Sequence, residues 1–409
     1  MDIVVQKYGG SSVGTTEKIK AVADKIIKKY NENKKVVVVL SAMGDSTNNL
    51  IDLAGQISKE PNSREMDVLL TTGEQVTISL LAMALIEKGY DAISFTGSQL
   101  NIKACGAHQS AKISDIDTTK IIDKLDEGKI VVVAGFQGIL ENGEFATLGR
   151  GGSDTSAVAL AAKLGARCEI YTDVEGIYTM DPRKLKGAKK LEYIAYEEMI
   201  ELADLGAKVL NFRSVLLASK YNVPMYVAST FSDASGTLIT DRELVNLEET
   251  IITGMTVNQE DIQITVLNLP SSSRSLSDLF MKIARDDVNV DMISQMVTKD
   301  KRMNVSFSIK GDNKKKVLNI LKLLKEEDKL IEWETNENIS KISVVGFGMK
   351  TNVGVAGKVF ELMAENDIEI KMITTSETRI TWMISRDREQ DAIDLIGEGF
   401  ELQRKGLDD

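Results

Sequence analysis

The sequence predicts an α/β protein with a mainly parallel central sheet, followed by two smaller α/β units. In the first part of the chain, short apolar, β-branched runs alternate with helical patterns, as in a parallel sheet covered on both faces. A polar, charged linker near residues 237–249 then precedes an internal repeat. With 409 residues and 43% hydrophobic content, the chain can form two or three domains, each with its own core.

The composition excludes several classes of function. The 61 acidic and 50 basic residues give a net charge of −11, the wrong sign for binding nucleic acid. The two cysteines, Cys105 and Cys168, exclude a disulfide framework and a cysteine-rich zinc site and fit a reducing compartment. No apolar run approaches the ~20 residues that span a bilayer, and Asp2 stands where a signal peptide needs positive charge. We therefore expect a cytoplasmic protein that acts on small molecules, without a membrane or nucleic-acid partner.

The single histidine, His108, limits the chemistry further. A Ser-His-Asp triad and a two-histidine metal site each need a particular set of partners. Residues 103–109 read as a loop, which favours a solvated surface histidine. Chemistry must then depend on Lys, Arg, Asp and Glu side chains, on backbone amides or on Mg²⁺, and we assign no residue as a metal ligand.

The first strand run, residues 3–5, leads into a glycine- and serine-rich turn at residues 7–14 and then into a helical pattern. Such a turn leaves backbone N–H groups unhindered at a helix N-terminus, where anions bind favourably. Lys7 precedes the glycines, whereas the lysine of a Walker loop follows them. The turn is therefore a candidate phosphate cradle, and an ordinary βα connection with a solvated lysine is the alternative.

Further strand runs at residues 36–40, 92–95, 130–136, 169–171 and 225–228 complete the predicted sheet. Polar loops follow four strand ends, and ligands of open α/β sheets bind at the carboxyl ends of the strands. We therefore expect these loops to converge on one crevice. They are residues 7–14, 41–47, 147–156 and 171–183.

Two charged residues near this crevice have structural alternatives. Thr71 and Glu74 fit a capping box that opens a long helix, although a carboxylate there could also hold an ammonium group. Arg150, in the second glycine-rich loop, offers a bidentate fork for a carboxylate or phosphate, whereas Ser153 or Asp154 could simply cap the following helix.

Taken together and in this order, the four loops resemble those of aspartokinases, members of the amino-acid kinase superfamily. The match covers essentially the whole chain, and loops 147–156 and 171–183 separate it from glutamate, carbamate and nucleotide kinases. The resemblance implies catalytic roles for Lys7 and Asp154, and it implies binding of the phosphates by Lys7, Gly9, Gly10, Ser11 and Ser12. It also implies aspartate binding by Ser41, Thr47, Glu74, Arg150 and Ser153, and nucleotide binding by Thr172, Asp173, Tyr178, Arg183 and Lys208. One departure stands beside Lys208, because Asn211-Phe212 replaces the family's usual His-Pro.

The C-terminal part contains an internal repeat. Positions between 262 and 293 recur, identical or conservatively changed, 80 residues later. Each copy resembles an ACT domain, an α+β amino-acid-sensing module with a ferredoxin-like fold. The resemblance places an amino-acid kinase-type three-layer sandwich at residues 1–245, the first ACT domain at 260–338, and the second at 250–259 plus 339–409.

The resemblance implies transfer of the γ-phosphoryl group of ATP, with Mg²⁺, to the side-chain carboxylate of L-aspartate, under feedback control. The alternatives are a related kinase of the glutamate or carbamate type and a non-catalytic amino-acid sensor. Lysine is the leading inhibitor, because Asp291 gives the first copy a carboxylate where the second has a lysine, and threonine is the alternative. The inhibitor-site candidates are Asp291, Gln295, Thr375 and Ser376, and Asp291 could equally be a solvated strand-end charge. We also expect a homodimer or homotetramer formed through the ACT domains.

Overall fold

The computed structural model describes residues 2–242, 251–298 and 300–404. The chain divides into two compact units, which are described separately below. The first contains Met1–Tyr178 and Lys190–Leu247, and the second contains Thr179–Lys189 and Glu248–Asp409. The predicted linker at residues 237–249 begins instead with a strand of the large sheet, Thr237–Thr240, and the part from residue 243 onward, including the expected domain boundary at residue 245, lies outside the described residues.

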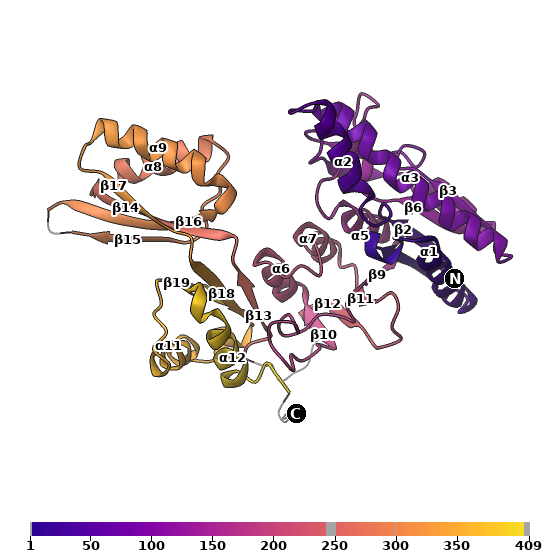
Figure 1. Cartoon of the computed structure of the whole chain (residues 1–409). Helices are drawn as coiled ribbons and strands as arrows, with labels where there is room; N and C mark the ends of the chain where they lie inside the picture. Colours follow the sequence, from indigo (N-terminus) through magenta and orange to yellow (C-terminus); the bar gives the residue numbers. More distant parts are fainter. Residues whose placement is uncertain (1, 243–250, 299, 405–409) are drawn as a thin grey trace. The chain divides into compact units, whose positions relative to one another are not determined.

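An eight-stranded sheet forms the centre of the first unit (Figure 1), in the order β10-β12-β11-β9-β1-β2-β6-β3. Every neighbouring pair is parallel except β11 and β12, which are antiparallel. A smaller sheet has the order β5-β4-β7-β8. The strands are β1 (Ile3–Tyr8), β2 (Lys35–Leu40), β3 (Ala92–Phe95), β4 (Ile102–Cys105), β5 (Lys112–Ile116), β6 (Ile130–Ala134), β7 (Gln137–Ile139), β8 (Phe145–Thr147), β9 (Arg167–Thr172), β10 (Tyr193–Ala195), β11 (Met225–Ser229) and β12 (Thr237–Thr240).

Helices cover both faces of the large sheet, as the apolar strands require. On one face, Val36, Val38 and Leu40 of β2 share a core with α1 and α3, whereas α5 packs against β1 and β2 on the other. The predicted α/β class with a mainly parallel sheet is therefore confirmed. The helices of this unit are α1 (Thr16–Asn31), α2 (Ser46–Ile57), α3 (Ser63–Glu87), α4 (Thr119–Asp126), α5 (Gly152–Leu164), α6 (Tyr196–Asp204) and α7 (Phe212–Tyr221).

The helix that contains Glu74 begins earlier than predicted. Asn62 is the N-cap of α3, and its side chain accepts hydrogen bonds from the backbone N–H groups of Arg64 and Glu65. Thr71 therefore lies in the interior of the helix, where its hydroxyl donates to the carbonyl of Val68 at 2.9 Å. The capping-box interpretation of Thr71 and Glu74 is wrong, because the helix begins eight residues before Thr71, at Ser63. A threonine is tolerated inside a helix when its hydroxyl donates to a carbonyl of the preceding turn. By length and composition α3 could also span a membrane, but half of its most apolar window is buried inside the protein, as in the core helix of a globular domain.

The second unit contains two four-stranded antiparallel sheets, each carrying helices. The first has the order β15-β16-β14-β17 and the second the order β13-β18-β20-β19. The first module consists of β14 (Asp261–Pro270), α8 (Ser273–Arg285), β15 (Ile293–Val297), β16 (Arg302–Lys310), α9 (Lys314–Glu327) and β17 (Glu332–Asn336). The second consists of β13 (Gly254–Asn258), β18 (Ile339–Val345), α10 (Gly348–Thr351), α11 (Val355–Glu365), β19 (Met372–Thr375), β20 (Arg379–Ser385) and α12 (Glu389–Gly399).

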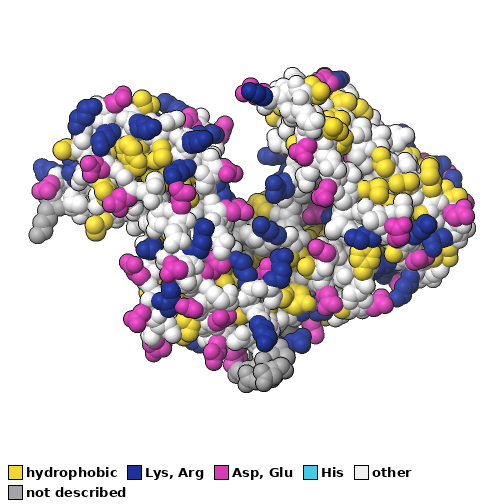
Figure 2. All heavy atoms as spheres, in the orientation of Figure 1, with side chains coloured by type: hydrophobic (Ala, Val, Ile, Leu, Met, Phe, Trp, Pro, Cys, Tyr) yellow, Lys and Arg dark blue, Asp and Glu magenta, His cyan; other side chains and the backbone are white. Residues whose placement is uncertain are grey.

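The sequence repeat corresponds to this structural repeat. Strands β14 and β18, helices α8 and α11, and strands β15 and β19 are the matching elements. The edge position that β17 fills in the first sheet is filled in the second by β13, which precedes both copies in the chain. On the molecular face in Figure 2, acidic and basic side chains are interspersed rather than segregated into fields of one sign.

Candidate active site

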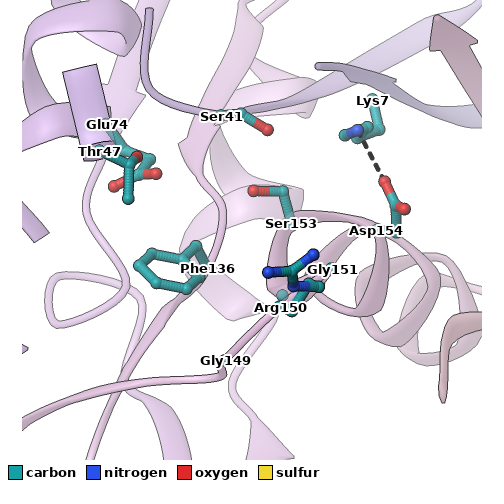
Figure 3. A pocket seen from close by; sticks show the side chains of 11 residues that line it. Lys7, Ser41, Thr47, Glu74, Phe136, Gly149, Arg150, Gly151, Ser153 and Asp154 are labelled. Carbon is teal, nitrogen blue, oxygen red and sulfur yellow. Dashed lines mark ion pairs between the residues drawn. The ribbon is translucent and has the colours of Figure 1, made fainter. Parts of the chain in front are cut away.

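Three of the four predicted polar loops, residues 7–14, 41–47 and 147–156, contribute to one cavity of about 240 Å³ in the first unit (Figure 3), whereas residues 171–183 do not line it. Strand β1, the residues that follow β2 and β6, helices α2, α3 and α5, and the loop before α5 contribute to its wall. The structure therefore brings together all seven residues predicted for aspartate binding and catalysis. The lining residues are Lys7, Ser41, Thr47, Glu74, Phe136, Gly149, Arg150, Gly151, Gly152, Ser153 and Asp154.

Lys7 lies near the end of β1, and its ammonium pairs with the Asp154 carboxylate at 2.7 Å. Both side chains are only 12% exposed, so the pair is weakly screened by solvent. The following glycines are needed for close approach: a Cβ on Gly9 would lie 3.2 Å from the Lys7 Nζ, and one on Gly10 would lie 2.9 Å from the Ala42 carbonyl oxygen. The turn therefore places a positive charge beside backbone that side chains do not cover.

The serines of this turn differ in environment. Ser11 is exposed, whereas Ser12 is buried and its hydroxyl lies 2.6 Å from that of Thr230, at the end of β11. The Thr230 hydroxyl also donates to the Thr172 carbonyl at 3.1 Å. Thr230, which the sequence analysis missed, thus ties the turn to the ends of β9 and β11. The Ser12 N–H donates to the Gly9 carbonyl at 2.9 Å, so both polar groups of Ser12 that could face a phosphate already have partners within the chain.

Glu74 is buried in the middle of α3, with 2% of its surface exposed. One carboxylate oxygen accepts a hydrogen bond from the Ala42 N–H at 3.1 Å, and the other, Oε2, is buried with no hydrogen-bond partner among the described residues. Burial raises the pKa of Glu74 to about 7. An unsatisfied carboxylate oxygen on a cavity wall is costly unless a ligand donates to it.

Arg150 lies between Gly149 and Gly151, whose φ angles of 74° and 72° are in the left-handed region that favours glycine. Gly151 is the N-cap of α5, and no side chain caps that helix. Ser153 and Asp154 therefore lie in its first turn, and their interpretation as N-caps is wrong. Both side chains instead line the cavity.

Phe136 also lines the cavity, although the sequence analysis placed it in a strand. Strand β6 ends at Ala134, and Phe136 has a positive φ of 67°. The Phe136 N–H donates to the Ser156 hydroxyl, and the Phe136 carbonyl accepts from the N–H of Leu148. These two hydrogen bonds hold the strained backbone in place. In the sequence, the glycine directly before this aromatic residue was the available signal that the strand ends before Phe136.

The residues predicted to bind the nucleotide do not line this cavity. Thr172 is the last residue of β9, the neighbour of β1, and Asp173 follows it. Tyr178 is half-buried near Glu175, and Lys208 is exposed. Arg183 belongs to the second unit, where its guanidinium pairs with the Asp181 carboxylate at 2.8 Å.

His108 is not the solvated surface residue that the loop composition favoured. Its side chain is 20% exposed, and its Nδ1 lies 2.7 Å from the carboxylate of Asp67, which is fully buried. The same carboxylate accepts hydrogen bonds from the Thr147 hydroxyl and the Gln109 N–H. Asp67 lies on α3, distant in sequence, so the composition of the loop alone could not reveal this partner.

The candidates for an inhibitor site lie in the second unit. Asp291 pairs with Lys341 at 2.6 Å, and Lys341, which is buried, also pairs with Asp261. Gln295 is exposed on the edge strand β15, Thr375 is exposed at the end of β19, and Ser376 accepts a hydrogen bond from the backbone of Arg379. The Asp291 carboxylate therefore already has a cationic partner within the chain.

The open, mainly parallel sheet and the charged cavity at its strand ends define an α/β protein with a small-molecule site. The family model described as "Amino acid kinase family" matches residues 2–229, and a model described as "ACT domain" matches residues 342–400. Among curated proteins, the "Aspartokinase" of Bacillus sp. (strain MGA3) is 48% identical over 98% of each chain, and "Aspartokinase 2" of Bacillus subtilis is 46% identical over 99% of each. The chain belongs to the aspartokinase family of amino acid kinases.

Solved structures agree with this assignment. E. coli aspartokinase III in complex with aspartate and ADP (R-state) matches with a TM-score of 0.78 and 25% identity, over 97% of this chain and 99% of that one. The same enzyme in complex with lysine and aspartate (T-state) matches with a TM-score of 0.77, the same identity and the same coverage. The expected fold, family and class of enzyme, a phosphotransferase with ACT domains, are therefore confirmed.

Proposed function

We propose that this chain transfers the γ-phosphoryl group of ATP to the side-chain carboxylate of L-aspartate, giving 4-phospho-L-aspartate and ADP. The observation that carries the proposal is the buried Oε2 of Glu74, which has no hydrogen-bond partner among the described residues and lies in the same cavity as Arg150 and Lys7. An acidic amino acid supplies complementary groups for these three charges: an ammonium, an α-carboxylate and a side-chain carboxylate. Family membership and the aspartate complexes of E. coli aspartokinase III support the same substrate.

The order of the charges along the cavity suggests how aspartate would bind. Figure 3 shows Glu74 and Thr47 at the end away from Lys7 and Asp154, with Arg150 between them. In the proposed complex, Glu74 accepts from the substrate ammonium and Arg150 holds the α-carboxylate through its guanidinium fork. The side-chain carboxylate then points toward Lys7, with Ser41, Thr47 and Ser153 as short hydroxyl partners.

The reaction needs no general base, because an aspartate side chain is already ionised at pH 7. Catalysis then depends on positioning and on neutralising charge on the transferring phosphoryl group. Lys7 and the backbone of Gly9, Gly10 and Ser11 would supply that positive charge, while Asp154 holds Lys7 in position through the 2.7 Å ion pair. A chain with one histidine, engaged with Asp67, is consistent with this chemistry.

Mg²⁺ fits this site only as a partner of the nucleotide. No group of three His, Cys, Asp or Glu residues that could hold a metal occurs among the described residues. We place Asp154, the carboxylate that pairs with Lys7, near the phosphates. Mg²⁺ typically binds one or two carboxylates together with substrate phosphates, and when bound it would offset phosphate charge. We place the nucleotide near Thr172, Asp173, Tyr178 and Lys208 of the first unit, whereas the role of Arg183, which belongs to the second unit, stays a prediction from the sequence.

A coupled assay of ADP release tests the proposal with aspartate, with glutamate and with no acceptor. We expect ADP release that requires both Mg²⁺ and aspartate. Equal turnover with glutamate would support a related kinase, and ligand binding without ADP release would support a non-catalytic sensor. Either result would contradict the proposed activity.

We further propose that the second unit regulates the enzyme. Residues 1–245 would form the catalytic domain, with ACT domains at 260–338 and at 250–259 plus 339–409. Lysine is the leading inhibitor and threonine the alternative, and the lysine complex of E. coli aspartokinase III supports this class of effector. By linkage, an inhibitor must favour a state that binds substrate less well or is less active. We expect a cytoplasmic enzyme.

The ACT modules are also the expected site of self-association. Strand β15 is an edge strand with all five residues exposed, among them Ile293, Met296 and Val297. Pairing such an edge with a second copy would cover it. Sedimentation at micromolar concentration should show a homodimer or homotetramer, and a monomer would contradict this prediction.

A further inference from the structure

The loop that carries Arg150 is anchored at its ends by another part of the chain. Arg150 is flanked by two glycines in the left-handed region, and glycine has the greatest backbone freedom of any residue. An exposed arginine in such a loop would point in many directions unless its backbone were fixed. The N-terminus of α7 provides that fixation.

Asn211 is the N-cap of α7, and its side chain makes two hydrogen bonds of different kinds. Its Oδ1 accepts from the Arg213 N–H at 3.0 Å, which caps the helix. Its Nδ2 donates to the Arg150 carbonyl at 3.1 Å. The same side chain lies against Gly151, where an added Cβ would come within 2.3 Å of it.

Arg213 binds the backbone at Leu148, which lies two residues before Arg150. Its guanidinium donates to the Leu148 carbonyl at 2.5 Å and to the Ala111 carbonyl at 3.1 Å. The backbone is therefore held both before and at Arg150 by neighbouring residues of one helix. These contacts fix the peptide from which the Arg150 side chain extends into the cavity.

We infer that Asn211 is a positioning residue for the aspartate subsite: through the Arg150 carbonyl it orients the guanidinium that holds the substrate α-carboxylate. The inference rests on the proposed function. It also gives a role to the departure at Asn211-Phe212, which lies next to Lys208 in sequence. The contact of Asn211 with Arg150 places its effect on aspartate rather than on the nucleotide.

Three variants separate this role from helix capping. Asn211→Ser keeps a good N-cap but is too short to replace the amide that reaches Arg150, whereas Asn211→Ala loses both functions. If Asn211 acts on Arg150, both variants should raise the KM for aspartate roughly three- to tenfold, with little change in kcat or in the KM for ATP. In the Arg150→Ala background, the Asn211→Ser change should have no further effect on the dissociation constant for aspartate, measured by calorimetry.

The outcomes are distinguishable. Wild-type affinity for aspartate in Asn211→Ser, or an equal effect of that change with and without Arg150, would overturn the positioning role and leave the proposed function intact. A rise in the KM for ATP alone would overturn it in favour of a nucleotide role. Failure of the wild-type enzyme to bind or phosphorylate aspartate would overturn both proposals.

Discussion

Replacing Glu74 with glutamine should raise the free energy of unfolding of the protein and lower its kcat/KM for aspartate. Glutamine has nearly the same shape and keeps an oxygen for the Ala42 N–H, but it cannot carry a negative charge. The buried Oε2, which has no partner among the described residues, would be replaced by an amide nitrogen. The substitution therefore removes the cost of a buried charge together with the proposed partner of the substrate ammonium.

The magnitude follows from the raised pKa. Burial raises the pKa of Glu74 from 4.5 to about 7, so the folded state holds this proton more tightly than the unfolded state. Stability consequently falls as pH rises between these two values, and above pH 7 the full cost is about 3 kcal/mol. Glu74→Gln should recover up to that amount at pH 8 and almost none below pH 4.5.

The same group sets the pH dependence of substrate binding. Only the ionised Glu74 attracts an ammonium, so the wild-type kcat/KM for aspartate should fall about tenfold between pH 8 and pH 6. In Glu74→Gln it should be lower at pH 8 by roughly 30-fold or more, because a buried charge pair is lost, and nearly independent of pH. Urea denaturation at the two pH values and initial-rate kinetics measure both effects.

Two results would refute this reasoning. A Glu74→Gln variant that kept the wild-type KM for aspartate would show that the carboxylate does not hold the ammonium. A variant less stable than wild type at pH 8 would show that the charge is stabilised in the folded state by something other than substrate. The combination of added stability and lost affinity is the expected signature of a binding site.

The remaining predictions concern both units. Lys7→Ala should lower kcat far more than it raises the KM for aspartate, because its charge acts on the transferring phosphoryl group, whereas Arg150→Ala should mainly raise that KM; initial-rate kinetics that showed Lys7→Ala altering KM alone would contradict the first role. Lys341→Met should destabilise the protein by about 2 kcal/mol in chemical denaturation, because it removes the buried partner of the buried Asp261 carboxylate and leaves that carboxylate only its pair with Lys310, whereas the matched control Lys310→Met, at a side chain that is 51% exposed, should cost less than about 1 kcal/mol. Lysine should inhibit the enzyme, and Asp291→Ala should raise the half-maximal concentration; equal values for wild type and variant would exclude Asp291 as its partner.

Sequence patterns predicted the parts of the fold that depend on local periodicity. Buried parallel strands such as β2 are continuous apolar runs, and the repeat revealed two related modules. The glycine-rich loops were recognisable because backbone that approaches a ligand closely needs glycine, as the close contact between Gly10 and the Ala42 carbonyl shows. These signals are local, so one sequence was sufficient.

Contacts between residues distant in sequence could not be predicted in this way. A helix-cap role was left open for Glu74 beside a binding role, because its partner, Ala42, lies on a loop distant in sequence. His108 was read as solvated because its partner, Asp67, lies on α3. Asn211 was noted only as a departure from a family pattern, and its contact with Arg150 required the folded chain. The pattern of hydrophobic residues determines where elements form, whereas pairs of polar groups depend on how those elements pack.

The most direct test of the central claim is to identify the product. An acyl phosphate reacts with hydroxylamine to give a hydroxamate, so the enzyme can be incubated with ATP, Mg²⁺, aspartate and hydroxylamine and the product analysed by mass spectrometry. Binding of the ammonium at Glu74 and of the α-carboxylate at Arg150 predicts a hydroxamate on the side-chain carboxylate alone. A hydroxamate on the α-carboxylate, or ADP release without any hydroxamate, would contradict the account.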